Sequence, residues 1–230
     1  MEDTTKLNKS KLGTKQYWDE FYAVERENFE KNPEDTGECW FNDNDAEEKM
    51  VEFLVDSRGM RSISEQCSMI DLGTGNGHLL FAMHENGFDG PMCGVDYSEQ
   101  SVQFAREIVQ ERGYGDNFKF EQADIFDSKW RPGEFDVVLD KGTLDAIALS
   151  GLTFDDGKKT IVDVYSQVIE KLLKPDGVFL ITSCNFTQDE LINIIESDSL
   201  ELWETVDYPS FEFGGVKGQT ICTVAFTKKK

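Results

Sequence analysis

Apolar residues in the first quarter of the chain recur at the three- and four-residue spacing of helices. A helix is predicted from Thr14, its N-cap, towards Asn32, and a second from about Asp45 to Arg58. The apolar stripe of the first helix consists of Tyr17, Phe21, Val24 and Phe29, with Trp18 and Tyr22 alongside. The dozen residues before it are polar and are predicted to be frayed.

From about residue 67 the pattern changes to short apolar runs that alternate with helical segments. Strands are predicted at 67–72, 92–95, 118–122, 135–139 and 178–182, and helices at 79–86, 98–112, 161–173 and 188–195. Lys174–Gly177 is predicted to end the helix at 161–173, before the fifth strand begins. Two closing strands, 201–207 and 220–227, have no clear helix between them and suggest an antiparallel hairpin. The pattern therefore predicts an α/β fold, with a mostly parallel sheet covered by helices on both faces.

The length of 230 residues suits a single domain, in which a helical extension (1–62) caps a core (63–230). No apolar run approaches the roughly 20 residues of a membrane span, and the N-terminal segment has no apolar stretch typical of a secretory signal. We therefore expect a cytoplasmic protein that does not bind membranes.

Charge and cysteine usage narrow the possible partners. The formal net charge of −22 repels phosphate backbones, so a nucleic acid is a poor substrate for this chain. The five cysteines are scattered without a C-x-x-C pair, and the only histidines are His78 and His84. This argues against a disulfide framework and against a metal site.

The residues with most chemical information follow the predicted strands. In open α/β sheets, ligands bind at the carboxyl ends of the strands. The first strand leads into Asp71-Leu-Gly-Thr-Gly-Asn-Gly77, whose glycines let the backbone turn tightly and approach a ligand closely. The second strand ends in Asp96, which can accept hydrogen bonds from both hydroxyls of an adenosine ribose, and the third in Asp124, placed to reach the adenine amino group. The fourth ends in Asp140.

The spacing of the glycines distinguishes between cofactors. A dinucleotide fingerprint has the form G-x-G-x-x-G, whereas this chain has G-x-G-x-G and places His78 where the last glycine would stand. The carboxylate of Asp71 would repel a pyrophosphate but attract a sulfonium with its ammonium. The pattern therefore favours S-adenosylmethionine over NAD. The alternatives are a glycine loop that only forms a turn, helix-capping roles for Asp96 and Asp124, and a non-catalytic binding module.

Four segments together resemble the lysine methyltransferases of translation elongation factor 1-alpha, within the seven-β-strand class I methyltransferases. They are Tyr17-Trp-Asp-Glu-Phe-Tyr22, Gly37-Glu-Cys-Trp-Phe41, Ile70–Gly77 and Asp140-Lys-Gly-Thr-Leu-Asp145. The resemblance implies a monomeric cytoplasmic enzyme with the Rossmann-like class I fold, the strand order 3-2-1-4-5-7-6 and a lysine side chain as methyl acceptor. It also implies cofactor contacts from Gly73, Thr74, Gly75, Asp96, Tyr97, Asp124 and Ile125. Asp71, from its charge beside the loop, and Trp40, as part of the cofactor's wall, are further candidates for the cofactor site.

The resemblance also directs attention to the acceptor. A lysine amine, with a pKa near 10.4, must lose a proton before it can attack the methyl group. Asp140 and Asp145 are the candidate catalytic carboxylates that would bind and orient the amine. Trp40, Phe41 and Tyr17 are candidates for an aromatic wall around it, although Trp40 and Phe41 are equally open to interpretation as core residues. A small-molecule methyltransferase with the same core is the alternative function.

Overall fold

The computed structural model describes residues 5–209, 211–213, 216–218 and 220–229. Its centre is a seven-stranded sheet in the order β3-β2-β1-β4-β7-β11-β8. The strands are β1 (Met69–Leu72), β2 (Met92–Asp96), β3 (Phe118–Gln122), β4 (Phe135–Lys141), β7 (Leu173–Ser183), β8 (Leu200–Val206) and β11 (Cys222–Lys228). The first five are parallel, and β11 runs antiparallel to both β7 and β8. Counted in chain order within this sheet, the strands confirm the predicted order 3-2-1-4-5-7-6.

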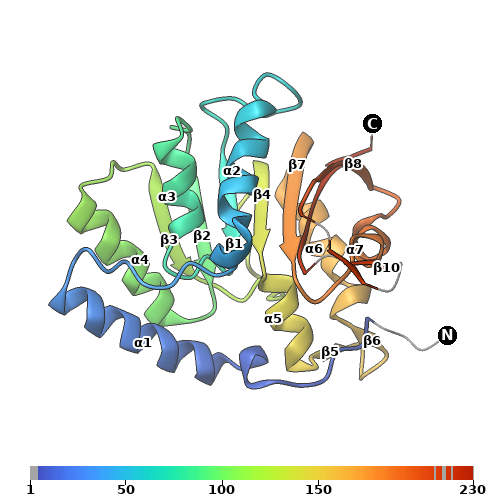
Figure 1. Ribbon diagram of the computed structural model, residues 1–230, viewed down its shortest axis with the longest axis horizontal. Coiled ribbons are helices and arrows are strands. Elements are labelled where there is room, and N and C mark those ends of the chain that lie inside the picture. Colours follow the sequence, from blue (N-terminus) through green and yellow to red (C-terminus); the bar gives the residue numbers. More distant parts are fainter. Residues whose placement is uncertain (1–4, 210, 214–215, 219, 230) are drawn as a thin grey trace.

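Helices cover both faces of the sheet (Figure 1). On one face lie α1 (Lys15–Lys31), α2 (Ala46–Asp56), α3 (His78–Glu85) and α4 (Glu99–Arg112). The other face carries α5 (Thr143–Ser150), α6 (Tyr165–Leu172) and α7 (Gln188–Ile195). Apolar residues of the strands alternate between the two layers, as the pleat requires: Met69 packs in the first and Ile70 in the second. Of these helices only α5 was not predicted.

The N-terminal segment is more ordered than its polarity suggests. Thr14 caps α1 as predicted, since its hydroxyl accepts a hydrogen bond from the Tyr17 amide. The predicted stripe, however, is displaced: Tyr22 and Phe29 are buried, whereas Val24 is 57% exposed. The prediction of frayed residues is wrong for the described part. There a 3₁₀ turn, η1 (Lys11–Gly13), packs along α5, and the Ser10 amide donates to the Leu149 carbonyl.

The predicted break at residues 174–177 lies inside a strand rather than before it. In the pairing of β7 with β4, Leu173 is opposite Phe135 and Val178 is opposite Val137. The residues between therefore bulge out of the ladder, and Asp176 within them has a φ of +63°. The turn-forming residues were identified correctly, but they form a bulge near the start of a long strand.

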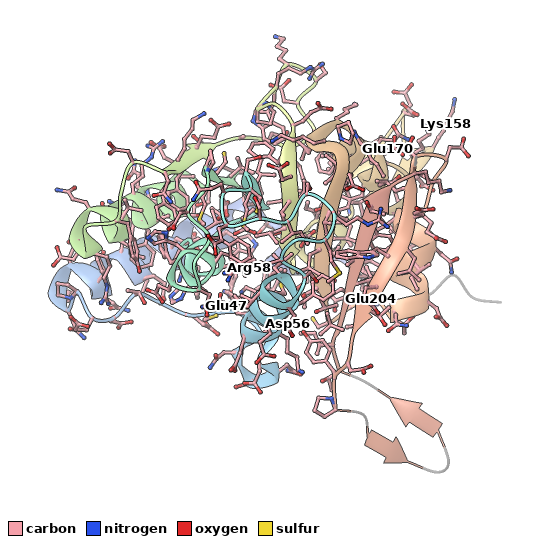
Figure 2. The ribbon with its side chains drawn as sticks, turned by 90° about the horizontal axis from the view of Figure 1, so that it is seen from above. Glu47, Asp56, Arg58, Lys158, Glu170 and Glu204 are labelled. Carbon is pink, nitrogen blue, oxygen red and sulfur yellow. The ribbon has the colours of Figure 1, made fainter. Side chains whose placement is uncertain are left out.

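Short elements complete the fold. Between β8 and β11, a separate two-stranded ribbon is formed by β9 (Phe211–Phe213) and β10 (Val216–Gly218) (Figure 2). A second ribbon, β5 (Thr153–Phe154) with β6 (Lys159–Thr160), leads into the 3₁₀ turn η3 (Ile161–Asp163) before α6. A further 3₁₀ turn, η2 (Asn42–Asn44), precedes α2. In the described part of the chain, no helix combines the length and the apolar character needed to cross a membrane.

Candidate functional site

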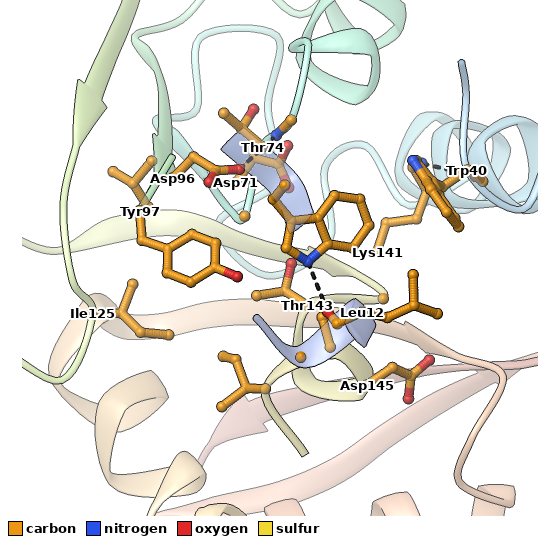
Figure 3. Close-up of a pocket in the computed structure, with 18 of the residues that line it drawn as sticks. Leu12, Trp40, Asp71, Thr74, Asp96, Tyr97, Ile125, Lys141, Thr143 and Asp145 are labelled. Atoms are coloured by element: carbon orange, nitrogen blue, oxygen red, sulfur yellow. Dashed lines mark hydrogen bonds between the residues drawn. The ribbon is translucent and has the colours of Figure 1, made fainter. Parts of the chain in front are cut away.

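A cavity of about 710 Å³ opens at the carboxyl ends of the parallel strands. This volume is in the range of about 300–1,000 Å³ that is usual for small-molecule pockets. Most of the residues predicted from the sequence line it (Figure 3), namely Trp40, Asp71, Gly73, Thr74, Gly75, Asp96, Tyr97, Asp124, Ile125 and Asp145. Asp140 and Tyr17 are the exceptions. The sheet thus brings together one cluster of side chains from five separate segments of the chain.

The glycine loop is constrained by its protein neighbours as well as by its turn. Gly73 and Gly75 have φ values of +65° and +57°, where side chains other than glycine are strained. A Cβ on Gly73 would come within 2.2 Å of the Thr143 hydroxyl oxygen, and one on Gly75 within 2.4 Å of the Tyr22 hydroxyl oxygen. The loop is therefore clamped between α1 and α5, which brings its backbone to the cavity wall.

Asp96 holds the next part of the site. Its two carboxylate oxygens accept hydrogen bonds from the amides of Gly75 (3.1 Å) and Ser98 (2.8 Å). Ser98, not Asp96, is the N-cap of α4. Burial raises the pKa of Asp96, against these hydrogen bonds. Each oxygen keeps a lone pair for a further donor, so a ribose with two adjacent hydroxyls fits this carboxylate.

Asp71 is the carboxylate at the start of the glycine loop. It is 3% exposed, and burial raises its pKa to about 7, although the charge of Lys141 acts in the opposite direction. Such a carboxylate would be stabilised in its ionised form by a cation entering the cavity. This buried carboxylate therefore fits the sulfonium and ammonium of S-adenosylmethionine.

Tyr97 and Ile125 lie at the opposite end of the cavity from Trp40 (Figure 3). Asp124, the neighbour of Ile125 in the chain, also lines the cavity. Asp124 is exposed, and one of its oxygens accepts a hydrogen bond from the Phe126 amide at 2.9 Å. No described helix begins at Asp124, so it does not cap one. Ile125 is half-buried and offers an apolar surface to a planar ring.

The two predicted catalytic carboxylates lie in different environments. Asp140 is fully buried outside the cavity wall; its carboxylate accepts hydrogen bonds from the Thr143 and Leu144 amides at the start of α5, and from the Tyr165 hydroxyl. Asp145, 4% exposed, lines the cavity and accepts from the Ser183 hydroxyl and the Cys184 amide. The pleat explains the position of Asp140. Asp71 pairs with Leu139 across the sheet, so the next residue points to the opposite face.

The Trp40-Phe41 segment forms one wall of the cavity. The Lys141 ammonium donates to the Trp40 carbonyl at 2.9 Å, and the Phe41 ring lies over Gly142, 2.8 Å from where a Cβ would stand. Phe41 has a φ of +66°, a strained conformation for a bulky residue. Two of the segments that carry the family resemblance, Gly37–Phe41 and Asp140–Asp145, are therefore in contact, although about a hundred residues separate them along the chain.

The rest of the wall differs by one helix position from the prediction. Tyr17 stacks on Phe21 and is not a lining residue, whereas Trp18 and Tyr22 are. Trp18 packs edge-on against Trp40, and its indole donates to the Leu12 carbonyl at 2.7 Å. The sequence pattern predicted the aromatic cluster. Which of its rings face the cavity depends on the rotation of α1 about its own axis.

Several lining residues were not predicted individually, above all Lys141, Thr143 and Leu12. The first two lie inside the segment from Asp140 to Asp145, where only the acids were considered. Leu12 lies in the polar N-terminal stretch, where the sequence carries no signal for it.

One group of side chains has the composition of a metal site. The ligand atoms of Cys39, Glu47 and His78 all lie within 4.8 Å of one another. Burial raises the pKa of the Cys39 thiol to about 11, and this thiol donates to Glu47, while the His78 ring contacts Thr36. These hydrogen bonds join the segment between α1 and α2, which carries Thr36 and Cys39, to Glu47 of α2 and His78 of α3.

Comparisons with known proteins agree with this geometry. A family model described as "Methyltransferase domain" matches residues 63–220. The protein-lysine N-methyltransferase EFM4 of Saccharomyces cerevisiae is 59% identical over 229 residues, which cover 100% of both chains. The EEF1A lysine methyltransferase 2 of Homo sapiens is 34% identical over 219 residues, 95% of this chain and 87% of the human one.

Solved structures share the fold at low sequence identity. The magnesium protoporphyrin IX methyltransferase of Synechocystis, solved with bound SAM, gives a TM-score of 0.56 at 15% identity and covers 90% of this chain and 97% of that one. A putative methyltransferase in complex with the Haloferax volcanii Trm112 activator gives 0.57 at 16% identity, covering 91% and 96%. These similarities support the arrangement of strands and helices, and nothing about the substrate.

Proposed function

The chain belongs to the S-adenosylmethionine-dependent protein-lysine N-methyltransferases, and from this premise we propose that its substrate is a lysine of translation elongation factor 1-alpha. Its vertebrate relatives at 34% identity, in Danio rerio and Homo sapiens, are named EEF1A lysine methyltransferase 2, which supports this substrate. The acidic charge of −22 supports a basic partner rather than a nucleic acid. We further propose that it acts in the cytoplasm as a monomer.

The proposed cofactor site runs along the cavity. Asp71 faces the cationic amino-acid end, beside the backbone of Gly73, Thr74 and Gly75. Asp96 binds the ribose hydroxyls, because both of its oxygens are oriented by backbone amides and retain acceptor capacity. Asp124, Tyr97 and Ile125 hold the adenine. The bound cofactor supplies a methyl group on a sulfonium that leaves as a neutral thioether.

Asp145 is our proposed amine-binding residue. It lines the cavity, and its carboxylate is held by Ser183 and Cys184, so it can accept a hydrogen bond from the amine at a fixed position. A carboxylate stabilises the charged ammonium, so Asp145 orients the amine but does not lower its pKa. Apolar surroundings from Trp40 and Phe41 have the opposite effect, because burial disfavours the charged form.

Asp140 then acts as a positioning residue. Its carboxylate caps the start of α5, the helix that carries Asp145 in its first turn. It also ties that helix to Tyr165 of α6. We propose that Asp140 maintains the orientation of Asp145 and does not contact the amine.

The observation that carries this proposal is the cavity itself, in which the proposed cofactor residues and Asp145 face one space. The test is mass spectrometry of purified elongation factor 1-alpha after incubation with the enzyme and S-adenosylmethionine. We expect mass increments of 14 Da per methyl group, a value set by the replacement of H by CH₃, that map to a lysine side chain. An elongation factor 1-alpha that gains no methyl group on any lysine under these conditions would refute this substrate.

A matched pair of variants assigns the amine-binding role. Asp145→Asn should lower kcat by about 10–100-fold while the affinity for the cofactor stays within about twofold, because only the acceptor loses a charge-assisted hydrogen bond. Asp127→Asn, an exposed aspartate that the cavity lining does not include, is the control. Equal loss of kcat and cofactor affinity in Asp145→Asn would instead assign Asp145 to the cofactor site.

A further inference from the structure

Lys141 occupies a position in the cavity that the proposed function leaves unexplained. It is the last residue of β4 and lies beyond Asp140, which pairs with Leu72 of β1. Because Leu139 and Asp71 are paired, the alternation of side chains sets Lys141 on the same face of the sheet as Asp71.

The ammonium of Lys141 has unused hydrogen-bonding capacity. One N–H donates to the Trp40 carbonyl at 2.9 Å, and an ammonium has three donors. In the described part of the chain Lys141 forms no ion pair, whereas Lys15, the other lysine in the cavity wall, is paired with Asp19 at 2.5 Å. Lys141 is nevertheless close enough to Asp71 for its charge to pull the pKa of that carboxyl downward.

Apart from Lys141 and the paired Lys15, the charged residues of the cavity wall are acidic. Asp71, Asp96, Asp124 and Asp145 all line it. These carboxylates suit the sulfonium, the ammonium and the hydroxyls of the cofactor, but they repel its one carboxylate. An anionic group in this wall needs a cation beside it, and Lys141 is free to supply one.

We propose that Lys141 binds the carboxylate of the methionine part of S-adenosylmethionine while Asp71 faces its ammonium. This inference rests on the proposed cofactor site and is independent of the protein that is methylated. It fits the ends of the cavity: Lys141 and Trp40 lie at one end, and Tyr97 and Ile125 at the other (Figure 3). The amino-acid end of the cofactor therefore lies under the Trp40-Phe41 segment.

The contact of Lys141 with Trp40 gives this role a consequence. One ammonium holds both the carbonyl of the aromatic wall and the carboxylate of the cofactor. The ammonium thus joins the wall around the acceptor amine to the amino-acid end of the cofactor. A cofactor analogue without the carboxylate removes one of these two contacts and leaves the other.

The experiment compares two ligands that differ only in this carboxylate, S-adenosylmethionine and decarboxylated S-adenosylmethionine, by titration calorimetry. The wild-type protein should bind the first about 10–100-fold more tightly, the range expected for a charge-assisted hydrogen bond. In Lys141→Gln this preference should disappear through weaker binding of S-adenosylmethionine, with affinity for the decarboxylated ligand within about twofold of wild type. Lys141→Arg should retain most of the preference, since it retains the charge.

Lys15→Gln is the matched control, because it removes a lysine of the same cavity wall that already has an acidic partner. It should keep the wild-type preference. Equal losses for both ligands in Lys141→Gln would overturn the proposal and leave Lys141 as a support for Trp40 alone; so would an unchanged preference. Binding of the decarboxylated ligand reports that each variant is folded. If elongation factor 1-alpha is not methylated but the ligand preference behaves as stated, only the proposed substrate fails.

Discussion

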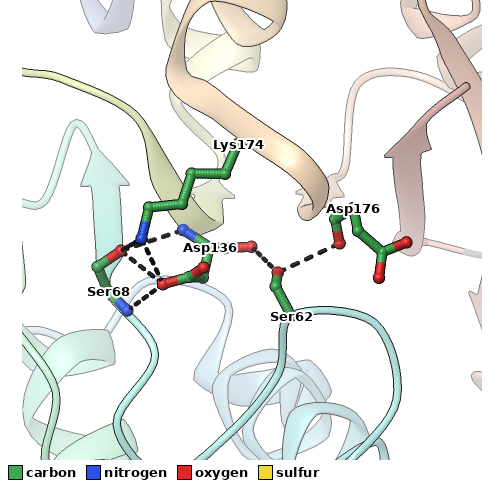
Figure 4. Close-up of polar contacts among 5 residues, drawn as sticks. All are labelled: Ser62, Ser68, Asp136, Lys174 and Asp176. Atoms are coloured by element: carbon green, nitrogen blue, oxygen red, sulfur yellow. Dashed lines mark hydrogen bonds and ion pairs between the residues drawn. The ribbon is translucent and has the colours of Figure 1, made fainter. Parts of the chain in front are cut away.

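Two aspartates on the same strand, Asp136 near the amino end of β4 and Asp140 near its carboxyl end, lie in opposite electrostatic environments. Burial raises the pKa of Asp136, but Lys174 at 2.8 Å and the amide and hydroxyl of Ser68 outweigh it, so the net shift is downward. Figure 4 shows this network, in which Ser62 also joins Asp136 to Asp176 through backbone carbonyls. Asp140 has hydrogen bonds but no cation, and burial raises its pKa to about 7.

This difference distinguishes the acids at the two ends of the parallel strands. At the amino end of β4, Lys174 neutralises the charge of Asp136, and the network joins β4 to β7 and to Ser68, the residue before β1. At the carboxyl end, Asp71 and Asp96 are also buried without an ion pair, and their pKa values are raised as well. Asp71 and Asp96 line the cavity, whereas Asp140 lies behind its wall. Perturbed carboxyls gathered at one end of a sheet are typical of a functional site.

The largest expected effect concerns Asp140. Its unfolded pKa is near 3.9 and its folded pKa about 7. The folded state therefore keeps a proton that the unfolded chain has lost, and the free energy of unfolding falls as pH rises from 4 to 7. This contribution is at most about 4 kcal/mol. In Asp140→Asn it should vanish, and urea denaturation at several pH values should give a flatter profile. A profile as steep as that of the wild type would mean that other carboxyls carry the pH dependence.

Next in size is the effect of Asp96→Ala on the cofactor. Loss of two charge-assisted hydrogen bonds to ribose hydroxyls should weaken binding of S-adenosylmethionine about 100-fold, as measured by calorimetry. Asp136→Ala should leave that affinity within about twofold, because Asp136 is not among the residues that line the cavity. Unchanged affinity in Asp96→Ala would remove this residue from the cofactor site.

Asp136→Ala should instead lower the free energy of unfolding, by about 2 kcal/mol at pH 7, because it removes the acceptor for Ser68 and Lys174. Its folded pKa lies below its unfolded one, so its stabilising effect is present above pH 4 and is lost as pH falls through the folded value. Denaturation curves of wild type and variant should therefore converge in acid. A difference that persists at pH 2 would point to lost packing rather than lost charge.

The smallest effect is a pH dependence of cofactor affinity through Asp71. Its pKa of about 7 falls when a cation binds beside it, so a proton must leave on binding below pH 7. Affinity for S-adenosylmethionine should drop by at most about tenfold from pH 8 to pH 6. Asp71→Asn should bind more weakly but with less pH dependence. S-adenosylhomocysteine, which lacks the sulfonium, should show a weaker dependence in the wild type.

Most of the strands could be predicted, because parallel strands buried on both faces leave long apolar runs. The strand order followed from the resemblance to the class I methyltransferases. The α5 helix was not predicted. The buried face of α1 was predicted wrongly at Tyr17 and Val24, because the helix carries aromatic residues on several sides. The N-terminal residues near Leu12 gave no signal, since their order comes from contacts with α5 and Trp18.

By itself, the sequence determined which cofactor this protein is built for: the G-x-G-x-G spacing and the acids that end successive strands are local features that any class I sheet brings to one edge. The tertiary structure alone decided what each acid can do there. Asp140 and Asp145 cannot be distinguished from the sequence. The pleat of β4 directs Asp140 to the opposite face of the sheet, whereas Asp145, in the first turn of α5, lines the cavity. Lys141 acquires its position in the same way, because its neighbours Trp40 and Asp71 are distant along the chain and adjacent only in the folded sheet.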